Sequence, residues 1–331
     1  MNTLMKNITG YHIYYQSKEF EKYREIDLMV QLTSALFWKK KFGPIKLYCN
    51  ERFLNTLKIW NLDKCYDEIN VELLENIPYK NYLSKYWSFC KIYTIKHISQ
   101  IDEKFVVLDT DLFIKKDLGL DLNKDLILYH KEVFKEDQLH KTYLLPSTFL
   151  SEDELKGYDW DILPTNAAFL YINNQEMVNK WYDWVIQVIE NNKDKIEYPD
   201  SADTVFIEQR LLPTLVEKMG LDVGFVFDST YKTWVDGVDD LSDWEPKLDS
   251  TEELQFRMDN SRHIWGLKNS YRFVDIRQLI LYSSISSLRE EFQMSIIESK
   301  YSKLFDICYE IFNDESNSID PPVNWLIEKI G

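Results

Sequence analysis

Two aspartates spaced one residue apart follow a run of apolar residues. Residues 105–108 are Phe-Val-Val-Leu, a pattern that favours a buried β-strand, and Asp109 and Asp111 come directly after it. In open α/β sheets, ligands bind just beyond the carboxyl ends of the strands, so both carboxylates should face one aqueous pocket. Carboxylate oxygens suit Mg²⁺ or Mn²⁺, which would in turn bind phosphate oxygens. The pattern therefore predicts a metal-dependent site for a phosphorylated ligand.

A second Asp-x-Asp pair, formed by Asp159 and Asp161, has no apolar strand before it. Because the chain contains 55 acidic residues, the spacing by itself is a common pattern. The preceding strand therefore favours Asp109 and Asp111 as the site.

Composition and charge narrow the range of functions. With 331 residues and 45% hydrophobic residues, the chain can fold as one large α/β domain or two modest ones. A net charge of −16 argues against non-specific nucleic-acid binding, which requires a basic surface. It still allows a phosphorylated substrate, because a bound metal can supply the positive charge.

The cysteines and the apolar runs predict a cytoplasmic protein. Four cysteines are scattered without a Cys-x-x-Cys pair, which is typical of reduced packing residues. Residues 1–10 lack a signal-peptide core, and no run approaches the roughly 18 apolar residues that span a bilayer. This interpretation leaves open peripheral contact with the inner face of the membrane.

Alternating strands and helices should position the aspartates in a parallel sheet. Helices are expected at residues 24–41, 50–60, 86–97, 175–189 and 203–219, the last with a kink or as two abutting helices at Pro213. Strands are expected at 10–16, 45–49, 105–108, 125–129, 166–172 and 223–227, and a short strand or loop at 262–266. Residues 131–162 show little periodicity and are expected to shape a substrate pocket. A long amphipathic helix is expected at 287–312, where it could also mediate oligomer formation.

Four further segments carry residues suited to a nucleotide-sugar site. They are Ser88-Phe-Cys-Lys91, Thr165-Asn166-Ala167-Ala168, Phe206-Ile-Glu208-Gln209 and His263-Ile-Trp-Gly-Leu-Lys268. With the aspartate pair, and in this order over residues 9–270, they resemble the motifs of GT-A-fold nucleotide-sugar glycosyltransferases. The resemblance is greatest to the retaining glycosyltransferase family 8.

The resemblance implies a fold and a domain division. The expected fold is the GT-A form of α/β: a Rossmann-like mixed central sheet with flanking helices. Residues 1–284 would form this domain, with a nucleotide-binding half over about 9–120 and an acceptor half over about 121–270. Residues 285–331 would form a C-terminal helical tail.

The resemblance also implies roles for individual residues. Asp109, Asp111 and His263 would hold Mn²⁺ or Mg²⁺ on the diphosphate of a UDP-sugar, with Thr110 in the same nucleotide site. Lys268, and also Lys91, would contact the diphosphate. Asn166, Glu208 and Gln209 would be the catalytic residues that orient the donor sugar and the incoming hydroxyl, and Ala167 would face the donor. The uridine would lie against Tyr15, Gln16, Ser17 and Asn50.

The chain departs from the family pattern at several positions. Ala168 replaces the usual Gly, Glu208 replaces Asp, and the segment between His263 and Lys268 is one residue short. These departures keep open a non-catalytic relative that binds a sugar or a protein.

The expected function is transfer of a sugar from a UDP-sugar to a glycan or glycolipid acceptor, with retention implied by the family. An inverting enzyme would need a carboxylate base, for which Asp161, Asp203 and Glu208 are candidates. A haloacid-dehalogenase-type phosphatase is a further alternative, with Asp109 as nucleophile and the acidic residues Asp239, Asp240 and Asp243 near its metal. The position of the motif, over 100 residues from the N-terminus, and Phe113 beside it argue against a phosphatase.

Overall fold

The computed structural model describes thirteen stretches of the chain, and all structural statements below concern them. They are residues 5–16, 31, 34–35, 37–39, 41–59, 62–83, 87–114, 116–132, 159, 161–192, 206–227 with 230–231, and 261–263. The expected helix at 287–312, the tail at 285–331, the acidic residues 239–243 and most of residues 131–162 lie outside them.

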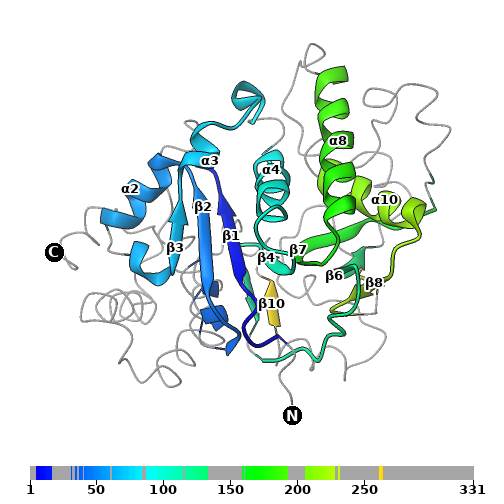
Figure 1. Ribbon diagram of the computed structural model, residues 1–331, viewed down its shortest axis with the longest axis horizontal. Coiled ribbons are helices and arrows are strands. Elements are labelled where there is room, and N and C mark those ends of the chain that lie inside the picture. The colour runs from blue at the N-terminus through cyan, green and yellow to red at the C-terminus, as the bar shows by residue number, and fades with distance from the viewer. Residues whose placement is uncertain are drawn as a thin grey trace, which may run out of the picture.

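A mixed β-sheet forms the centre of the molecule (Figure 1). Its strand order is β3-β2-β1-β4-β7-β6-β8, and β9 also pairs with β6. The strands β1, β2, β3 and β4 run parallel, whereas β7 is antiparallel to both β4 and β6. The bounds are β1 Gly10–Tyr14, β2 Ile45–Cys49, β3 Glu68–Asn70, β4 Phe105–Leu108, β6 Leu126–Glu132, β7 Thr165–Ile172, β8 Val223–Phe225 and β9 Thr230–Tyr231.

A separate two-stranded ribbon leaves the sheet after β4. Its strands are β5, Leu112–Ile114, and β10, Ser261–His263, which pair antiparallel. In this register His263 lies opposite Leu112.

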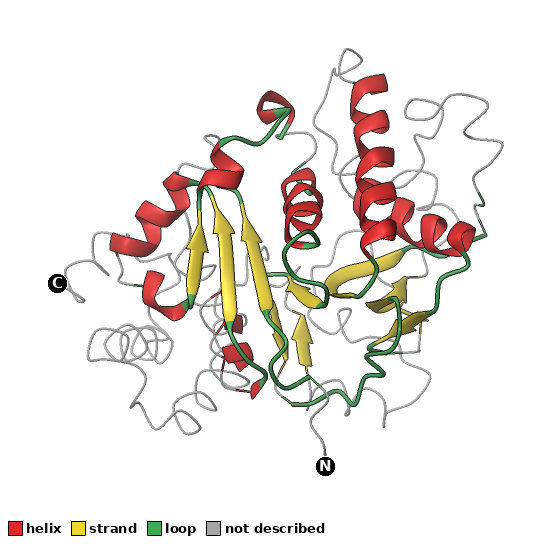
Figure 2. Cartoon of the chain, in the orientation of Figure 1, coloured by secondary structure: helices red, strands yellow, loops and turns green. Residues whose placement is uncertain are grey.

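Helices flank the sheet (Figure 2). They are α2 Glu51–Ile59, α3 Glu72–Glu75, α4 Phe89–Ile98, α8 Gln175–Asn192 and α10 Leu211–Met219, with short 3₁₀ turns at Asp63–Cys65 and Lys80–Tyr82. A π-helical turn, η3 (Phe206–Arg210), precedes α10. The predicted α/β class with a mixed central sheet and flanking helices is therefore confirmed.

Hydrophobic cores lie on both faces of the sheet. This is expected where a strand, such as β4, has apolar side chains on both of its faces. Along β4, Val106 and Leu108 join a cluster with the residues of β2 and α2. Phe105 and Val107 alternate to the other face, where they join a cluster with α4, α8 and α10. This double burial explains why residues 105–108 are uniformly apolar.

The helix expected at 203–219 differs from the prediction. The described part begins with the π-helical turn η3, and α10 starts at Leu211. Pro213 thus lies in the first turn of α10, where a missing backbone N–H costs no intrahelical hydrogen bond. Of the two predicted arrangements, two abutting helical segments describe the structure better than a kink at Pro213, because η3 ends at Arg210 and α10 begins at Leu211.

Three of the four cysteines behave as packing residues. Cys49, Cys65 and Cys90 are buried free thiols. Burial raises the pKa of the Cys49 and Cys90 thiols to about 12, so neither is a thiolate at neutral pH. Cys308 lies outside the described residues. No helix in the described ranges is long and apolar enough to cross a membrane.

Candidate functional site

Asp109 and Asp111 lie where β4 turns into β5. The amide of Leu112 donates to the carbonyl of Asp109 (3.0 Å), which closes the turn. The amide of Asp109 donates to the carbonyl of Ala168 (2.8 Å), which ties the turn to β7. The Asp109 side chain is 35% exposed, whereas Asp111 is buried. The strand and the two aspartates after it are thus where the sequence predicted them, and their sharing of one aqueous pocket stays a prediction.

The ammonium group of Lys91, on α4, joins three segments of the site. Its Nζ lies 2.6 Å from Asp109 Oδ1, 2.6 Å from Glu208 Oε1 and 2.7 Å from the carbonyl oxygen of Ala167. An ammonium has three N–H donors, so these contacts use all of them. Burial by itself lowers the pKa of Lys91, but the charges of Asp109 and Glu208 outweigh it and raise the pKa. Lys91 is therefore charged and held in place by the two carboxylates.

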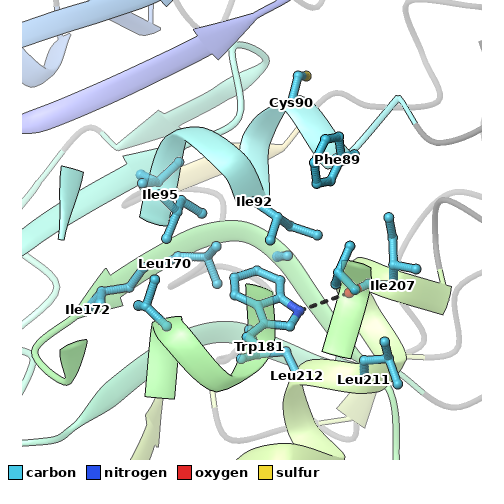
Figure 3. Close-up of a cluster of buried hydrophobic side chains, with 14 of the residues drawn as sticks. Phe89, Cys90, Ile92, Ile95, Leu170, Ile172, Trp181, Ile207, Leu211 and Leu212 are labelled. Atoms are coloured by element: carbon cyan, nitrogen blue, oxygen red, sulfur yellow. Dashed lines mark hydrogen bonds between the residues drawn. The ribbon is translucent and has the colours of Figure 1, made fainter. Parts of the chain in front are cut away.

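The position of Glu208 depends on the core beneath it. Glu208 and Gln209 lie on η3, and the indole N–H of Trp181 donates to the carbonyl of Ile207 in that turn (2.9 Å). Figure 3 shows Trp181 among Leu170, Ile92 and the start of α10, with this hydrogen bond drawn as a dashed line. π-Helical turns often occur at functional sites, because they redirect a side chain that a regular helix would place elsewhere.

Asn166 is the second residue of β7, and both sides of its side-chain amide are hydrogen-bonded. Its Nδ2 donates to Glu132 Oε1 (2.9 Å), and its Oδ1 accepts from the amide of Ala168 (2.9 Å). Glu132, at the end of β6, is itself buried. Glu132 was not among the predicted site residues, because the apolar run that predicted the strand ends at Tyr129 and the polar run His130-Lys131-Glu132 gives no signal that would extend it.

The two alanines that follow Asn166 have different surroundings. Ala167 joins the core cluster beneath α4, and its carbonyl accepts from Lys91. The methyl group of Ala168 packs into the cluster on the opposite face of the sheet. The methyl group that replaces the usual Gly hydrogen therefore has a place in the core.

Gln16 and Asn50 hold two strand ends together. Asn50 Oδ1 accepts from the amide of Gln16 (3.1 Å), and Asn50 Nδ2 donates to the carbonyl of Gln16 (2.9 Å). The Gln16 side-chain oxygen accepts from the hydroxyl of Thr56 (3.3 Å). Both residues are buried, so their amides brace β1 against β2 at the predicted uridine position. Tyr15 beside them is partly buried, which raises the pKa of its phenol.

The remaining predicted site residues are placed less completely. The register of β10 brings the backbone of His263 opposite Leu112, directly after Asp111. Thr110 lies in the turn between the aspartates. Ser17 and Lys268 lie outside the described residues. In the second Asp-x-Asp pair, the amide of Asp161 donates to Asp159 Oδ1 (2.9 Å) within an exposed turn.

The donor set at the turn suits a hard divalent cation only in part. Asp109 and Glu208 outnumber the single ammonium of Lys91, so the cluster keeps a net negative charge that would attract a cation. Oxygen ligands of this kind are those that Mg²⁺ and Mn²⁺ prefer. Within the described part of the chain, however, no group of three His, Cys, Asp or Glu residues is spaced to hold a metal. A third ligand would have to come from elsewhere.

Comparisons with solved structures give weak similarities. Mouse xyloside xylosyltransferase 1 is 13% identical with a TM-score of 0.39, over 66% of this chain and 84% of that one. The galactosyltransferase LgtC is 13% identical with a TM-score of 0.36, over 66% and 73%. The glycosyltransferase GlyE of Streptococcus pneumoniae TIGR4 is 15% identical with a TM-score of 0.34, over 66% and 45%. Similarity at this level supports no conclusion about activity.

A search of curated proteins found none that matches. A family of unknown function, DUF6734, matches residues 18–256.

Proposed function

We propose that this chain, which belongs to the DUF6734 family of unknown function, is a metal-dependent glycosyltransferase that uses a nucleotide-sugar. One observation carries the proposal: Asp109, Ala167 and Glu208, from three separate segments, meet at the ammonium of Lys91. These are the segments whose sequence resembles the donor site of GT-A-fold glycosyltransferases. If the three resemblances were coincidental, these segments would have no reason to meet at the buried ammonium of one lysine.

In the proposed mechanism the donor is a UDP-sugar, and the acceptor is a hydroxyl of a glycan or glycolipid. Asp109, Asp111 and His263 would hold Mn²⁺ or Mg²⁺, which supplies positive charge to the departing diphosphate. Lys268 would add to that charge. The retaining outcome follows from the resemblance to family 8 and belongs to the proposal as well.

Each of the chain's own residues has a separate task in this proposal. Lys91 positions Asp109 and Glu208, since its three donors are already used by protein acceptors. Asn166, held by Glu132, presents its amide to the donor sugar. Glu208 and Gln209 orient the reacting sugar and the incoming hydroxyl. Rigid placement of this kind lowers the entropic cost of bringing two reactants together.

The test is release of UDP from UDP-sugars by the full chain, with and without Mn²⁺. We expect Mn²⁺-dependent release, and we expect Asp111→Ala to lose at least about 100-fold in rate because a ligand of the leaving-group metal is gone. The matched control is Asp159→Ala, which removes an aspartate from the exposed pair and should keep wild-type activity. Full activity of Asp111→Ala would refute the metal site.

Binding separates this proposal from its alternatives. A thermal-shift screen of UDP-, GDP- and CMP-sugars should show stabilisation by one of them that requires Mn²⁺; a ligand at 100 times its Kd stabilises the native state by about 2.7 kcal/mol. Binding without turnover would indicate a non-catalytic relative. Inorganic phosphate released from a model phosphomonoester would indicate the phosphatase.

A further inference from the structure

A chain of buried polar side chains lies behind the aspartate turn. His12, in the middle of β1, is fully buried, and its Nδ1 lies 2.9 Å from the hydroxyl of Tyr66 while its Nε2 lies 3.1 Å from the hydroxyl of Ser34. Gln31 Nε2 lies 2.8 Å from the same Tyr66 oxygen. The Ser34 hydroxyl lies 2.5 Å from the carbonyl oxygen of Leu112. The five groups come from four separate segments of the chain.

The direction of each hydrogen bond follows from the last one. A carbonyl oxygen can only accept, so the single hydroxyl proton of Ser34 is donated to Leu112. Ser34 must then accept from His12, which places the imidazole proton on Nε2. The imidazole is neutral, because burial lowers the pKa of His12 to about 3 although the charge of Asp111 acts in the opposite direction.

The other half of the chain is determined in the same way. In a neutral imidazole with its proton on Nε2, Nδ1 can only accept, so the Tyr66 hydroxyl donates to it. The Tyr66 oxygen then accepts from the amide of Gln31. All the bonds therefore point from Gln31 toward Leu112, and hydrogen bonds aligned in this way strengthen one another.

The acceptor at the end of the chain is at a sensitive position. Leu112 directly follows Asp111, and its amide closes the turn onto the carbonyl of Asp109. Its strand, β5, also pairs with β10, where His263 lies opposite Leu112. Holding the carbonyl of Leu112 thus fixes the joint between the aspartate turn and the strand that carries His263.

We propose that Gln31, Tyr66, His12 and Ser34 form a directional hydrogen-bond chain that holds the aspartate turn in its binding geometry. His12 and Ser34 are then positioning residues, which act on Asp111 through Leu112 without touching the substrate. The part of the proposal that concerns metal affinity rests on the proposed function; the part that concerns the turn does not.

The tautomer of His12 is tested by ¹⁵N NMR of the imidazole nitrogens in the full chain. The signal that disappears in His12→Gln identifies the residue among the five histidines. We expect a neutral ring with its proton on Nε2 at pH 7 and still at pH 5. A cationic ring, or a proton on Nδ1, would overturn the direction of the chain.

Whether the hydrogen-bond chain holds the aspartate turn is tested by comparing the variants Ser34→Ala and Ser99→Ala. Ser99 is also a buried serine that donates to a carbonyl, that of Lys96 at the end of α4 (2.9 Å), so the same chemical group is removed at a distance from the turn. We expect hydrogen exchange of the Leu112 amide to be about 10-fold faster in Ser34→Ala and unchanged in Ser99→Ala. Equal exchange in both variants would refute the proposal, whether or not metal binds.

Mn²⁺ binding, followed by electron paramagnetic resonance, tests the link to the site. Loss of a group that orients a metal ligand typically costs about 10-fold in affinity or more, so Ser34→Ala should bind Mn²⁺ about 10-fold more weakly than Ser99→Ala. Wild-type affinity in Ser34→Ala would refute the link. If the wild-type protein binds no Mn²⁺, the proposed function is refuted. The hydrogen-exchange experiment would still decide whether the hydrogen-bond chain holds the turn.

Discussion

Replacing Lys91 with methionine should destabilise the protein more than replacing a residue of an exposed ion pair would. The Lys91 and Glu208 side chains are 9% and 6% exposed, and their charged atoms lie 2.6 Å apart. Removing one partner of a buried pair typically costs about 3–5 kcal/mol, because the other charge stays buried without it. Asp109 is 35% exposed, so water will compensate much of its share of the loss. We therefore expect a loss near the lower end, about 3 kcal/mol, mostly through Glu208.

The assay is urea unfolding of the full chain, in which a shifted midpoint at constant slope reports a change in stability. The matched control is Lys46→Met. Lys46 and Glu68 are also close, at 2.8 Å, but their side chains are 28% and 58% exposed. Such surface pairs contribute about 0–1 kcal/mol. A loss of less than about 1 kcal/mol in Lys91→Met would contradict the burial argument.

A second substitution separates lost charge from lost packing. In Lys91→Met with Glu208→Gln, the buried carboxylate is replaced by a neutral amide of the same shape. Stability should then recover by about 1–2 kcal/mol relative to Lys91→Met, since the uncompensated charge has gone. If the double variant is no more stable than Lys91→Met, the loss comes from packing and the electrostatic argument fails.

The stabilisation that Lys91 provides has a defined pH dependence. The pKa of Lys91 is raised in the folded state, so its stabilisation is complete below the unfolded value of about 10.4 and is lost as the pH rises beyond it. The difference in stability between wild type and the double variant, in which Glu208 is neutral and cannot titrate, should therefore be the same at pH 6 and pH 9. A difference that shrinks between these values would show that Lys91 titrates there.

Two further outcomes follow from buried hydrogen bonds. Trp181→Phe removes the donor to the carbonyl of Ile207 and should lower the free energy of unfolding by about 1–3 kcal/mol, measured in urea. The control is Trp184→Phe on the same helix, which should cost less because that ring is only partly buried. Equal losses would contradict the role given to the indole N–H of Trp181. The pKa of His12 is lowered in the folded state, so its contribution to stability is present above about pH 6.5 and falls by about 1.4 kcal/mol per pH unit below it. Between pH 6.5 and pH 5 the wild type should lose about 2 kcal/mol more than His12→Gln, and parallel pH profiles would show that His12 takes up a proton in the folded state.

Some properties were readable from the sequence because they depend on one segment at a time. The uniformly apolar run 105–108 and the polar residues after it predicted a doubly buried strand that ends in two carboxylates, and β4 has this form. The apolar period of residues 175–189 likewise predicted α8. Periodicity reports which face of a single element is buried, and that is enough to predict the class of fold.

Local pattern was a poor guide where the backbone departs from regular geometry. Residues 203–219 have helical periodicity, yet η3 is a π-helical turn. Within it, the carbonyl of Ile207 accepts a hydrogen bond from Trp181 on another helix. A contact with α8 thus decides where Glu208 lies. The pattern of one segment contains no information about such a contact.

Tertiary structure alone decided which polar groups meet. Lys91 was predicted to contact the diphosphate, but the fold brings Asp109, Ala167 and Glu208 around its ammonium, and these contacts use all three donors. Asn50 looked like a base-binding amide, but the pairing of β1 with β2 places it against the backbone of Gln16. The sequence determined which residues had the chemistry for a phosphate-linked site. The sheet order and register determined their partners, because those partners lie far apart in the chain and only the folded backbone brings them within a hydrogen bond of each other.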